Sequence, residues 1–429
     1  MLPLLILLAL NYYTRRIIVL FYLKVMHPNI VPCNWRFALL CWLLVLAACS
    51  DDTAVLTGID VLARDKFQPL HASRVALITN HTGVDRHGRS TIRLLHDAEN
   101  VDLVRIFSPE HSLSGKLDIP LIDDDIDSGT GIPIVSLYGK VRRPTPEMLD
   151  GIDTLVFDIQ DIGARFYTYI STMGNAMQAA AENHLRFVVL DRPNPINGVD
   201  VAGPMLDDGK QSFVGFHRLP VRHGMTVGEL AHLFKAEMAI DVDLQVIAME
   251  GWQRYEYFDT TELPWINPSP NIRNLTEAVL YPGIGLLETT KLSVGRGTDT
   301  PFEVIGAPWI DGPALATYLT EASLPGVSFE AIRFTPDASK FAGEACGGIR
   351  LTITAREIFD PLRVGFEIAR HLAIAYADTW DVDAYLRLLG NDRTLQAVRD
   401  GLPYSEILAS YEDGLNAFRE RRSRYLLYP

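Results

Sequence analysis

Residues 101–111 read VDLVRIFSPEH, an apolar run that ends in a proline, a glutamate and a histidine. A run of this kind is typical of a strand buried in a parallel sheet. Pro109 restricts the backbone beside Glu110 and His111. Because open α/β sheets place their chemistry outside the carboxyl ends of strands, we expect Glu110 to do acid–base work. The simpler interpretation is a glutamate at the start of a helix.

Similar apolar runs recur along the first half of the chain. They cover residues 75–79, 133–137, 154–158 and 187–190. Segments with helical spacing, such as 168–183, lie between them. Strands that alternate with helices indicate βαβ units. The sequence therefore predicts an α/β fold, with a Rossmann-like, doubly wound and mostly parallel sheet domain over residues 56–250.

The second half of the chain has a different character. Residues 251–300 are rich in proline, glycine and aromatic residues, so we expect an ordered connecting segment that contributes to an active-site cleft. Over residues 301–429 the pattern predicts a smaller α+β C-terminal domain. Its expected strands are 327–334 and 349–354, and its expected helices are 361–377 and 386–397.

The N-terminal segment has the pattern of a bacterial signal. Residues 37–48 read FALLCWLLVLAA, which is too short to span a bilayer but suits the core of a signal peptide. Small residues precede Cys49, as they precede the lipidated cysteine of a bacterial lipobox. We expect a signal peptide or mis-called extension over residues 1–48, a linker over 49–55 and a lipid anchor at Cys49. A plain secretory signal or a membrane anchor is the alternative.

This segment also bears on the start of translation and on location. Translation from Met26 instead of Met1 would give a signal peptide of normal length. Ser50 favours the outer membrane of a Gram-negative envelope, so we expect a lipid-anchored envelope protein that faces the periplasm. If Cys49 carries lipid, only Cys346 remains beyond the signal, which leaves no intramolecular disulfide. The apolar surroundings of Cys346 favour a packed structural thiol.

Composition and missing motifs argue against several classes of protein. The chain has 429 residues, of which 48% are apolar and 21% charged, as is ordinary for a globular protein. Its formal net charge of −14 argues against nucleic acid as a partner. The sequence contains no GxGxxG motif after a predicted strand, no P-loop, and no HExxH, GxSxG or CxxC motif. We therefore expect neither a nucleotide cofactor nor a metal site.

Polar side chains follow four of the predicted strands and are expected to line one crevice. They are Asn80, Glu110, His111, Asp158, Gln160, Asp161, Arg165, Asp191, Arg192 and Asn194. Each could instead cap a helix or form a salt bridge, and Arg165 could bind a carboxylate through two hydrogen bonds. His223 lies beside a glycine in VRHGMT, where a structural histidine is the more common outcome.

Eight motifs occur in an order typical of one family: FSPEH, DIQDIGARFYTY, DRPNP, VRHGMT, PSPNIRN, YPG…LE…T, GRGTD and PFEVIGAPW. They resemble the bacterial exo-β-N-acetylmuramidases of the NamZ type over residues 56–429. The resemblance implies a Rossmann-like domain, a smaller C-terminal domain and an active site in the cleft between them. It also implies a glycoside hydrolase of cell-wall turnover that needs no cofactor. Such an enzyme releases N-acetylmuramic acid from the non-reducing end of peptidoglycan fragments.

The resemblance implies catalytic roles for several residues. The proposed catalytic glutamate of the family lies in a PEHG motif and matches Glu110, while Ser112 stands where the family usually has that glycine. Asp158 or Asp161, with His223, would assist water or hold the acetamido group of the sugar. The substrate's own acetamido group is a further candidate for this second role. Retaining, inverting and substrate-assisted chemistry are all compatible with the sequence.

The sugar also explains which binding residues are expected. Its lactyl carboxylate requires a cation, which Arg165, Arg192, Arg273 or Arg296 could supply, and its amide and hydroxyl groups require polar partners. The predicted binding set is Asn80, Gln160, Arg165, Asp191, Arg192, Asn194, Ser269, Asn271, Arg273, Arg296 and Asp299.

Two rival functions fit part of the sequence. A lipid-anchored protein that binds muropeptides such as MurNAc-GlcNAc without cleaving them would use the same crevice. An esterase or amidase that acts on cell-wall peptides would need a nucleophile, and the sequence offers no candidate. Glu110 is the feature that separates the hydrolase from the binding protein.

Overall fold

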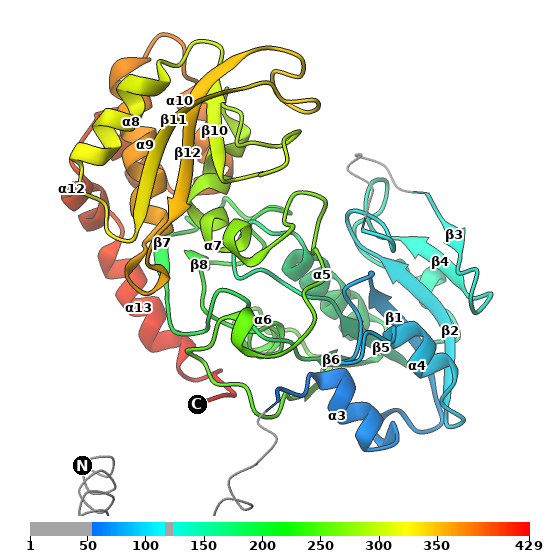
Figure 1. Cartoon of the computed structure of the whole chain (residues 1–429). Helices are drawn as coiled ribbons and strands as arrows, with labels where there is room; N and C mark the ends of the chain where they lie inside the picture. Colours follow the sequence, from blue (N-terminus) through cyan, green and yellow to red (C-terminus); the bar gives the residue numbers. More distant parts are fainter. Residues whose placement is uncertain (1–53, 116–122) are drawn as a thin grey trace, which may run out of the picture. The chain divides into compact units, whose positions relative to one another are not determined.

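The computed structural model describes residues 54–115 and 123–429, and Figure 1 shows their arrangement. The predicted signal segment and Cys49 lie outside the described residues. Within the described part of the chain, no helix has the length and apolar character that crossing a membrane requires. The lipid anchor therefore stays a prediction from the sequence.

Seven strands form the central sheet, in the order β3-β4-β2-β1-β5-β6-β9. Their bounds are β1 Ser73–Thr79, β2 Val101–Ser108, β3 Asp125–Ile126, β4 Pro133–Ser136, β5 Thr154–Asp158, β6 Arg186–Leu190 and β9 Asp243–Ile247. Every neighbouring pair is parallel except β3 with β4. The parallel strands follow the order of the Rossmann fold, which reverses between β1 and β5. The predicted doubly wound α/β domain is confirmed.

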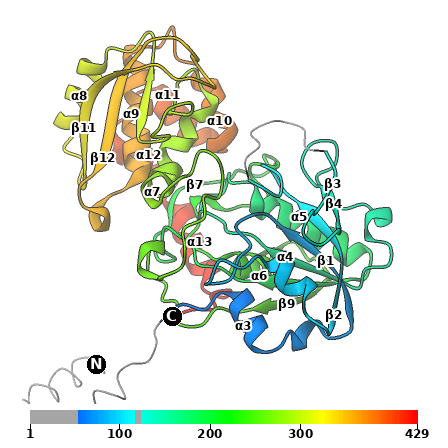
Figure 2. The ribbon, with the colours of Figure 1, turned by 45° about the vertical axis from the view of Figure 1, so that its right-hand side comes forward.

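Helices cover both faces of this sheet (Figures 1 and 2). They are α3 Gly58–Arg64, α4 Thr91–His96, α5 Tyr169–Glu182 and α6 Val227–Glu237. Val156 of β5 packs in the same hydrophobic cluster as α3 and α4, whereas the neighbouring Phe157 packs in the cluster of α5 and α6. Successive side chains of a strand point to opposite faces, so a strand buried on both sides is apolar throughout.

A smaller lobe contains a three-stranded antiparallel sheet in the order β10-β12-β11 (Figure 1). Its strands are β10 Val304–Ala307, β11 Val327–Phe334 and β12 Cys346–Ile353. Its helices are α8 Gly312–Glu321, α9 Pro361–Ala375, α10 Val382–Leu389, α11 Asp392–Arg399, α12 Tyr404–Ala409 and α13 Glu412–Arg422. The predicted α+β character of this region is confirmed.

The helix predicted over residues 386–397 is wrong, because two helices occupy this range. α10 ends at Leu389, and Gly390 follows with a φ of 63° in the left-handed region. A glycine in this conformation terminates a helix without steric cost. The side chain of Asn391 then accepts a hydrogen bond from the Thr394 amide and starts α11.

Ordered elements connect the two lobes. The connecting region contains α7 Leu275–Ile284, and a two-stranded sheet lies before it, made of β7 Ala202–Met205 and β8 Pro220–Arg222. The 3-10 helices are η1 Gln68–Leu70, η2 Pro146–Leu149, η3 Phe258–Thr260, η4 Gly285–Thr289 and η5 Arg356–Ile358. One hydrophobic cluster runs from Phe157 in the central sheet to Phe366 in α9, and residues 54–429 form one compact unit. The lobes therefore share a core.

Candidate active site

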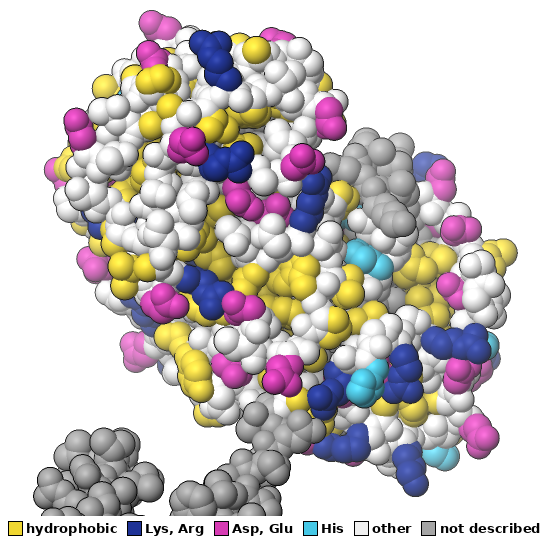
Figure 3. Space-filling model, viewed as in Figure 1, with side chains coloured by type: hydrophobic (Ala, Val, Ile, Leu, Met, Phe, Trp, Pro, Cys, Tyr) yellow, Lys and Arg dark blue, Asp and Glu magenta, His cyan; other side chains and the backbone are white. Residues whose placement is uncertain are grey.

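A cavity of about 640 Å³ opens at the carboxyl end of β2. Its walls come from both lobes. The residues that follow β2 and the loop before α5 form one side, and α7, η4 and α10 form the other. Figure 3 shows hydrophobic side chains exposed between the two lobes, with acidic and basic side chains beside them. Ligands of open α/β sheets bind outside the carboxyl ends of strands near a reversal of strand order, so this position is the expected one.

Glu110 lies two residues beyond the end of β2 and lines the cavity. It is partly buried, and its Oε2 accepts a hydrogen bond from the hydroxyl of Thr168, the residue that precedes α5. A strand end and a helix start thus hold one carboxyl group at the cavity wall. A carboxyl group fixed beside a ligand-sized space is suited to proton transfer.

The backbone after Glu110 takes an unusual conformation. His111, which also lines the cavity, and Ser112 have φ angles of 69° and 66°, in the left-handed region that favours glycine. Ser112 stands at the position of the glycine in the PEHG motif, and its Oγ lies 3.0 Å from Oγ of Ser114. The loop therefore keeps a glycine-like backbone although the glycine is replaced.

Glu288 faces the same cavity from η4. Its Oε1 forms an ion pair with Arg296, and the two side chains are only 21% and 25% exposed. Gly295 and Gly297 flank Arg296 with φ angles of 82° and 80°, which explains why glycines surround the arginine in the GRGTD motif. Arg296, one of the predicted binding residues, also lines the cavity.

Aromatic side chains form much of the remaining wall: Tyr138, Phe166, Tyr167, Tyr281 and Phe302. The ring centroids of Tyr281 and Phe166 are 5.0 Å apart, and those of Tyr281 and Phe302 are 4.8 Å apart. Burial raises the pKa of Tyr281 well above its ordinary value, and the charges of Glu288 and Glu110 raise it further. Both carboxyl groups therefore act electrostatically on the same phenol.

Asp158 and Arg192 form a buried ion pair and do not line the cavity. Nε of Arg192 lies 2.5 Å from Oδ1 of Asp158, Nη2 lies 2.9 Å from Oδ2, and the hydroxyl of Thr91 also donates to Oδ2. The pair joins the ends of β5 and β6 to the start of α4. The salt-bridge alternative describes these two residues better than a role in catalysis or in binding the lactyl group.

Asp161 and His223 form a second buried pair outside the cavity lining. The Met225 amide donates to Nδ1 of His223 at 3.2 Å, and Nε2 lies 3.5 Å from Oδ2 of Asp161. The same carboxylate oxygen accepts a hydrogen bond from the Gly163 amide. This pair fixes the loop after β5 against the loop that precedes α6.

Arg165 is fully buried, and its guanidinium is engaged with backbone carbonyls. Nη1 donates to Pro204 and Leu219, and Nη2 donates to Leu388 and Leu389, at 2.7 to 3.0 Å. Burial lowers the pKa of Arg165 to about 9, so the side chain is still charged at neutral pH. Arg165 therefore ties α10 to the sheet of β7 and β8, and its terminal nitrogens are not available to a substrate carboxylate.

Of the other predicted binding residues, Asp299 is exposed and lies outside the cavity lining. The remaining seven fall into three groups. Ser269 and Asn271 line the cavity. Arg273 stands outside the lining and joins two loops, because it donates to the backbone carbonyls of Pro270, Thr298 and Asp299. Four more residues are buried and hydrogen-bonded to neighbouring protein groups: Asn80, Gln160, Asp191 and Asn194.

The sequence prediction missed most of the residues that line the cavity, among them Thr168, Tyr281, Glu288 and Arg387. The first three lie inside two of the recognised motifs, DIQDIGARFYTY and YPG…LE…T. The motifs therefore indicated these positions, but the residue types alone did not assign them a function. Arg387 lies on the exposed side of α10, where a single arginine carries no signal. Among the described residues, no group of three or more His, Cys, Asp or Glu side chains is placed to hold a metal ion.

Comparison with known proteins identifies relatives along almost the whole described chain. The model of the N-terminal domain of exo-beta-N-acetylmuramidase NamZ matches residues 75–276, and the model of its C-terminal domain matches 279–428. A Bacillus subtilis (strain 168) protein named peptidoglycan beta-N-acetylmuramidase NamZ is 43% identical over 378 residues, which cover 87% of this chain and 91% of that protein.

Two crystal structures of DUF1343 family proteins from Bacteroides fragilis have the same fold. One superposes with a TM-score of 0.82 at 38% sequence identity and covers 88% of this chain and 99% of its own. The other has a TM-score of 0.72 at 31% identity and covers 87% of this chain and 99% of its own.

Proposed function

The chain belongs to the NamZ family of exo-β-N-acetylmuramidases, and we propose that it is itself a glycoside hydrolase that releases N-acetylmuramic acid from the non-reducing end of peptidoglycan fragments. The observation that carries this proposal is Glu110, a carboxyl group held at the wall of a cavity of about 640 Å³. Such a cavity has room for a small sugar ligand.

Glu110 acts as the general acid in this proposal. Its carboxyl proton passes to the glycosidic oxygen as the bond to the anomeric carbon breaks, so that the leaving sugar departs as a neutral alcohol. Thr168 contributes by fixing the orientation of the carboxyl group. Aromatic residues such as Tyr281 and Phe302 offer apolar surface to the faces of the sugar ring.

The lactyl carboxylate of N-acetylmuramic acid needs a cation in the cavity. Arg296 is the one of the four predicted arginines that lines it, together with the unpredicted Arg387. Ser269 and Asn271 are placed to bind the amide and hydroxyl groups. This assignment makes MurNAc-GlcNAc and related fragments the expected substrates.

The decisive experiment uses the protein without residues 1–48, because residues 54–429 form one compact unit. It is incubated with a nitrophenyl N-acetylmuramide and with MurNAc-GlcNAc, and sugar release is followed by chromatography. We expect release from both, and a loss of about 100- to 10,000-fold in kcat for Glu110→Gln on the disaccharide. Glu330→Gln, an exposed change on β11 outside the cavity, is the matched control.

The rival function is a binding protein for muropeptides. Tight binding of MurNAc-GlcNAc without any release would establish that rival and refute the hydrolase. Full activity of Glu110→Gln would leave the hydrolase standing and refute the assignment of Glu110.

We further propose that Cys49 carries a lipid that anchors the enzyme in the bacterial envelope, facing the periplasm. The support is the sequence: an apolar segment over 37–48, small residues before the cysteine, and a polar stretch after it. Peptidoglycan fragments occur in this compartment. Cells that express the full chain and are fed an alkyne fatty acid should label the wild type, and Cys49→Ser should abolish the label and release the protein from the membrane fraction.

A further inference from the structure

The cavity that holds Glu110 contains a second acid. Among the described residues that line it, Glu110 and Glu288 are the two carboxylates, one from each wall. Hydrolysis of a glycoside commonly requires two carboxyl groups, one to protonate the leaving oxygen and one on the opposite face of the sugar. The inference below rests on the proposed function and assigns this second role.

The position of Glu288 is fixed by the elements around it. Nζ of Lys340 donates to the backbone carbonyl of Glu288, and the hydroxyl of Thr289 donates to the carbonyl of Ala384 at 2.7 Å. The first contact attaches η4 to the segment between β11 and β12, and the second attaches it to α10. A group on a supported element keeps its geometry during a reaction.

The two carboxylate oxygens of Glu288 have different surroundings. Arg296 binds Oε1, and the described part of the chain offers no hydrogen-bond donor to Oε2. An ionised carboxylate with one free oxygen beside a cavity is the arrangement that a general base needs. Glu288, Glu110 and Tyr281 all line the same cavity.

The residues predicted from the sequence for the second catalytic role interact with other protein groups. Asp158 is closed by Arg192 and Thr91, and Asp161 is buried against His223 and Gly163. None of the three predicted candidates, Asp158, Asp161 and His223, lines the cavity. Glu288 does, without any rearrangement.

We propose that Glu288 is the second catalytic carboxylate and acts as general base on the attacking water. Oε2 takes one proton from water, the water oxygen forms a bond to the anomeric carbon, the bond from that carbon to the glycosidic oxygen breaks, and Glu110 gives its proton to the departing oxygen. Glu110 ends ionised and Glu288 protonated, and transfer of one proton through solvent restores both. The first product is N-acetylmuramic acid with the α configuration.

The variant-free test is the configuration of the first product. Proton NMR of wild-type enzyme with MurNAc-GlcNAc should show the α anomer before mutarotation. The β anomer as first product would overturn the role of Glu288 as base, because retention needs a covalent or acetamido intermediate. If no sugar is released at all, the proposed function has failed and not this assignment.

The variants separate catalysis from positioning. Glu288→Gln should lower kcat by about 100- to 10,000-fold on both the nitrophenyl substrate and the disaccharide. Glu110→Gln should lose much less on the nitrophenyl substrate, because nitrophenolate departs without a proton. Equal losses of Glu110→Gln on both substrates, or an active Glu288→Gln, would contradict the division of roles.

Azide identifies the face on which Glu288 acts. With Glu288→Ala, added azide should restore turnover and form α-N-acetylmuramyl azide, because a small anion can occupy the space of the carboxylate and attack without a base. Arg296→Gln should lose less activity than Glu288→Gln and should not respond to azide. If Arg296→Gln matches Glu288→Gln and azide has no effect on Glu288→Ala in a folded protein, Glu288 only positions Arg296 and the proposal falls.

Discussion

The site depends on single residues that the chain brings together from distant positions. Glu110 follows a strand of the first lobe, while its hydrogen-bond donor, Thr168, precedes a helix that begins 59 residues later. On the opposite wall, Glu288 and Arg296 form their pair across eight residues. The chemistry of the cavity therefore rests on the orientation of a few side chains, and small changes at these positions should affect turnover more than binding.

Thr168→Val removes the hydroxyl that donates to Glu110 and keeps the shape of the side chain. Without this hydrogen bond the carboxyl group can rotate, so we expect kcat on MurNAc-GlcNAc to fall about 10- to 100-fold while KM changes little. Steady-state kinetics provide the measurement. Thr168→Ser restores the hydroxyl and should recover most of the rate. A rise in KM with kcat unchanged would show that Thr168 acts in binding.

Arg387→Ala tests how the cavity recognises the lactyl carboxylate. Arg387 has no hydrogen bond or ion pair with another residue of 54–115 or 123–429, so its charge is available to a ligand. We expect KM for a nitrophenyl N-acetylmuramide to rise about tenfold, since hydrogen bonds to charged groups contribute about 1.5–3 kcal/mol. The corresponding N-acetylglucosaminide lacks the carboxylate and should show no change in KM. Arg393→Ala, an exposed arginine on α11, is the control, and equal effects on both sugars would refute this role.

At the scale of elements, the central sheet was predictable because its strands carry a strong signal. β1, β2, β5 and β6 are buried on both faces, and this burial requires continuous apolar runs that stand out in the sequence. The end of β2 also led to the prediction of Glu110 as a site residue. The break between α10 and α11 was not predictable, because a glycine inside a helical pattern either is tolerated or ends the helix, and packing decides which occurs.

The second wall of the cavity escaped prediction for a related reason. Glu288 and Arg387 reach the cavity only because η4 and α10 pack together, and no local pattern encodes this contact. Conversely, polar residues near strand ends were predicted to belong to the site although their partners are protein groups, as for Asp158, Arg165 and Arg192. Residue type and strand position do not distinguish a polar group that faces a ligand from one that is buried against its own chain.

The crossing of α7 and α9 positions η4 and depends on glycine. A Cβ atom on Gly283 would lie 1.8 Å from the backbone oxygen of Pro361, so Gly283→Ala must separate the helices. We expect a loss of about 1–3 kcal/mol in the free energy of unfolding, and a lower kcat because η4, which carries Glu288, follows α7 directly. Urea unfolding and kinetics measure the two effects.

A helical glycine with a milder contact provides the control for that change. A Cβ on Gly414 in α13 would come no closer than 3.2 Å to another atom, Cγ of the flexible Met205 side chain, and alanine favours helix, so Gly414→Ala should change the free energy of unfolding much less than Gly283→Ala does. Equal stability of Gly283→Ala and the wild type would show that the helices can separate without cost.

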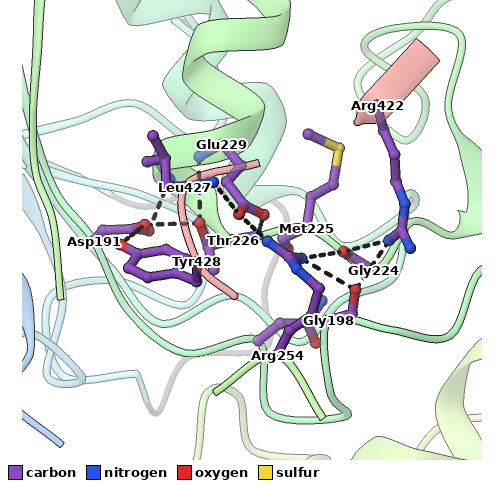
Figure 4. A network of polar contacts seen from close by, with 12 residues as sticks. Asp191, Gly198, Gly224, Met225, Thr226, Glu229, Arg254, Arg422, Leu427 and Tyr428 are labelled. Carbon is purple, nitrogen blue, oxygen red and sulfur yellow. Dashed lines mark hydrogen bonds and ion pairs between the residues drawn. The ribbon is translucent and has the colours of Figure 1, made fainter. Parts of the chain in front are cut away.

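At the scale of the whole molecule, the C-terminal end of the chain returns to the first lobe. The hydroxyl of Tyr428 donates to Asp191 at the end of β6, and the Leu427 amide donates to Glu229 (Figure 4). The Arg254 amide donates to the carbonyl of Pro429. Arg254 also pairs with the buried Glu229. These contacts attach the chain after α13 to the lobe of the central sheet. Arg165 joins the two lobes at a second place, near the cavity.

The burial of Asp191, which accepts a hydrogen bond from Tyr428, makes stability depend on pH. Burial raises the pKa of Asp191 from 3.8 to about 6, while hydrogen bonds from Tyr428, the Gly228 amide and Thr226 oppose the rise. Between pH 4 and pH 6 the folded protein retains a proton that the unfolded chain releases, so the contribution of Asp191 to stability falls as pH rises through this range and is constant above it. Thermal unfolding at a series of pH values should show this decline, superimposed on the effects of other groups.

Tyr428→Phe isolates the contribution of this carboxyl group. Loss of the hydroxyl removes a hydrogen bond that favours the charged carboxylate, so the pKa of Asp191 should rise further and the variant should be destabilised more at pH 8 than at pH 5. We expect a loss of about 1–3 kcal/mol at pH 8. The hydroxyl also accepts from the Met249 amide, but that loss is independent of pH and cancels when the two pH values are compared. Tyr425→Phe, a nearby tyrosine, should show no such difference. If Tyr428→Phe costs the same free energy at both pH values, Asp191 is not the group that couples the C-terminal end of the chain to pH.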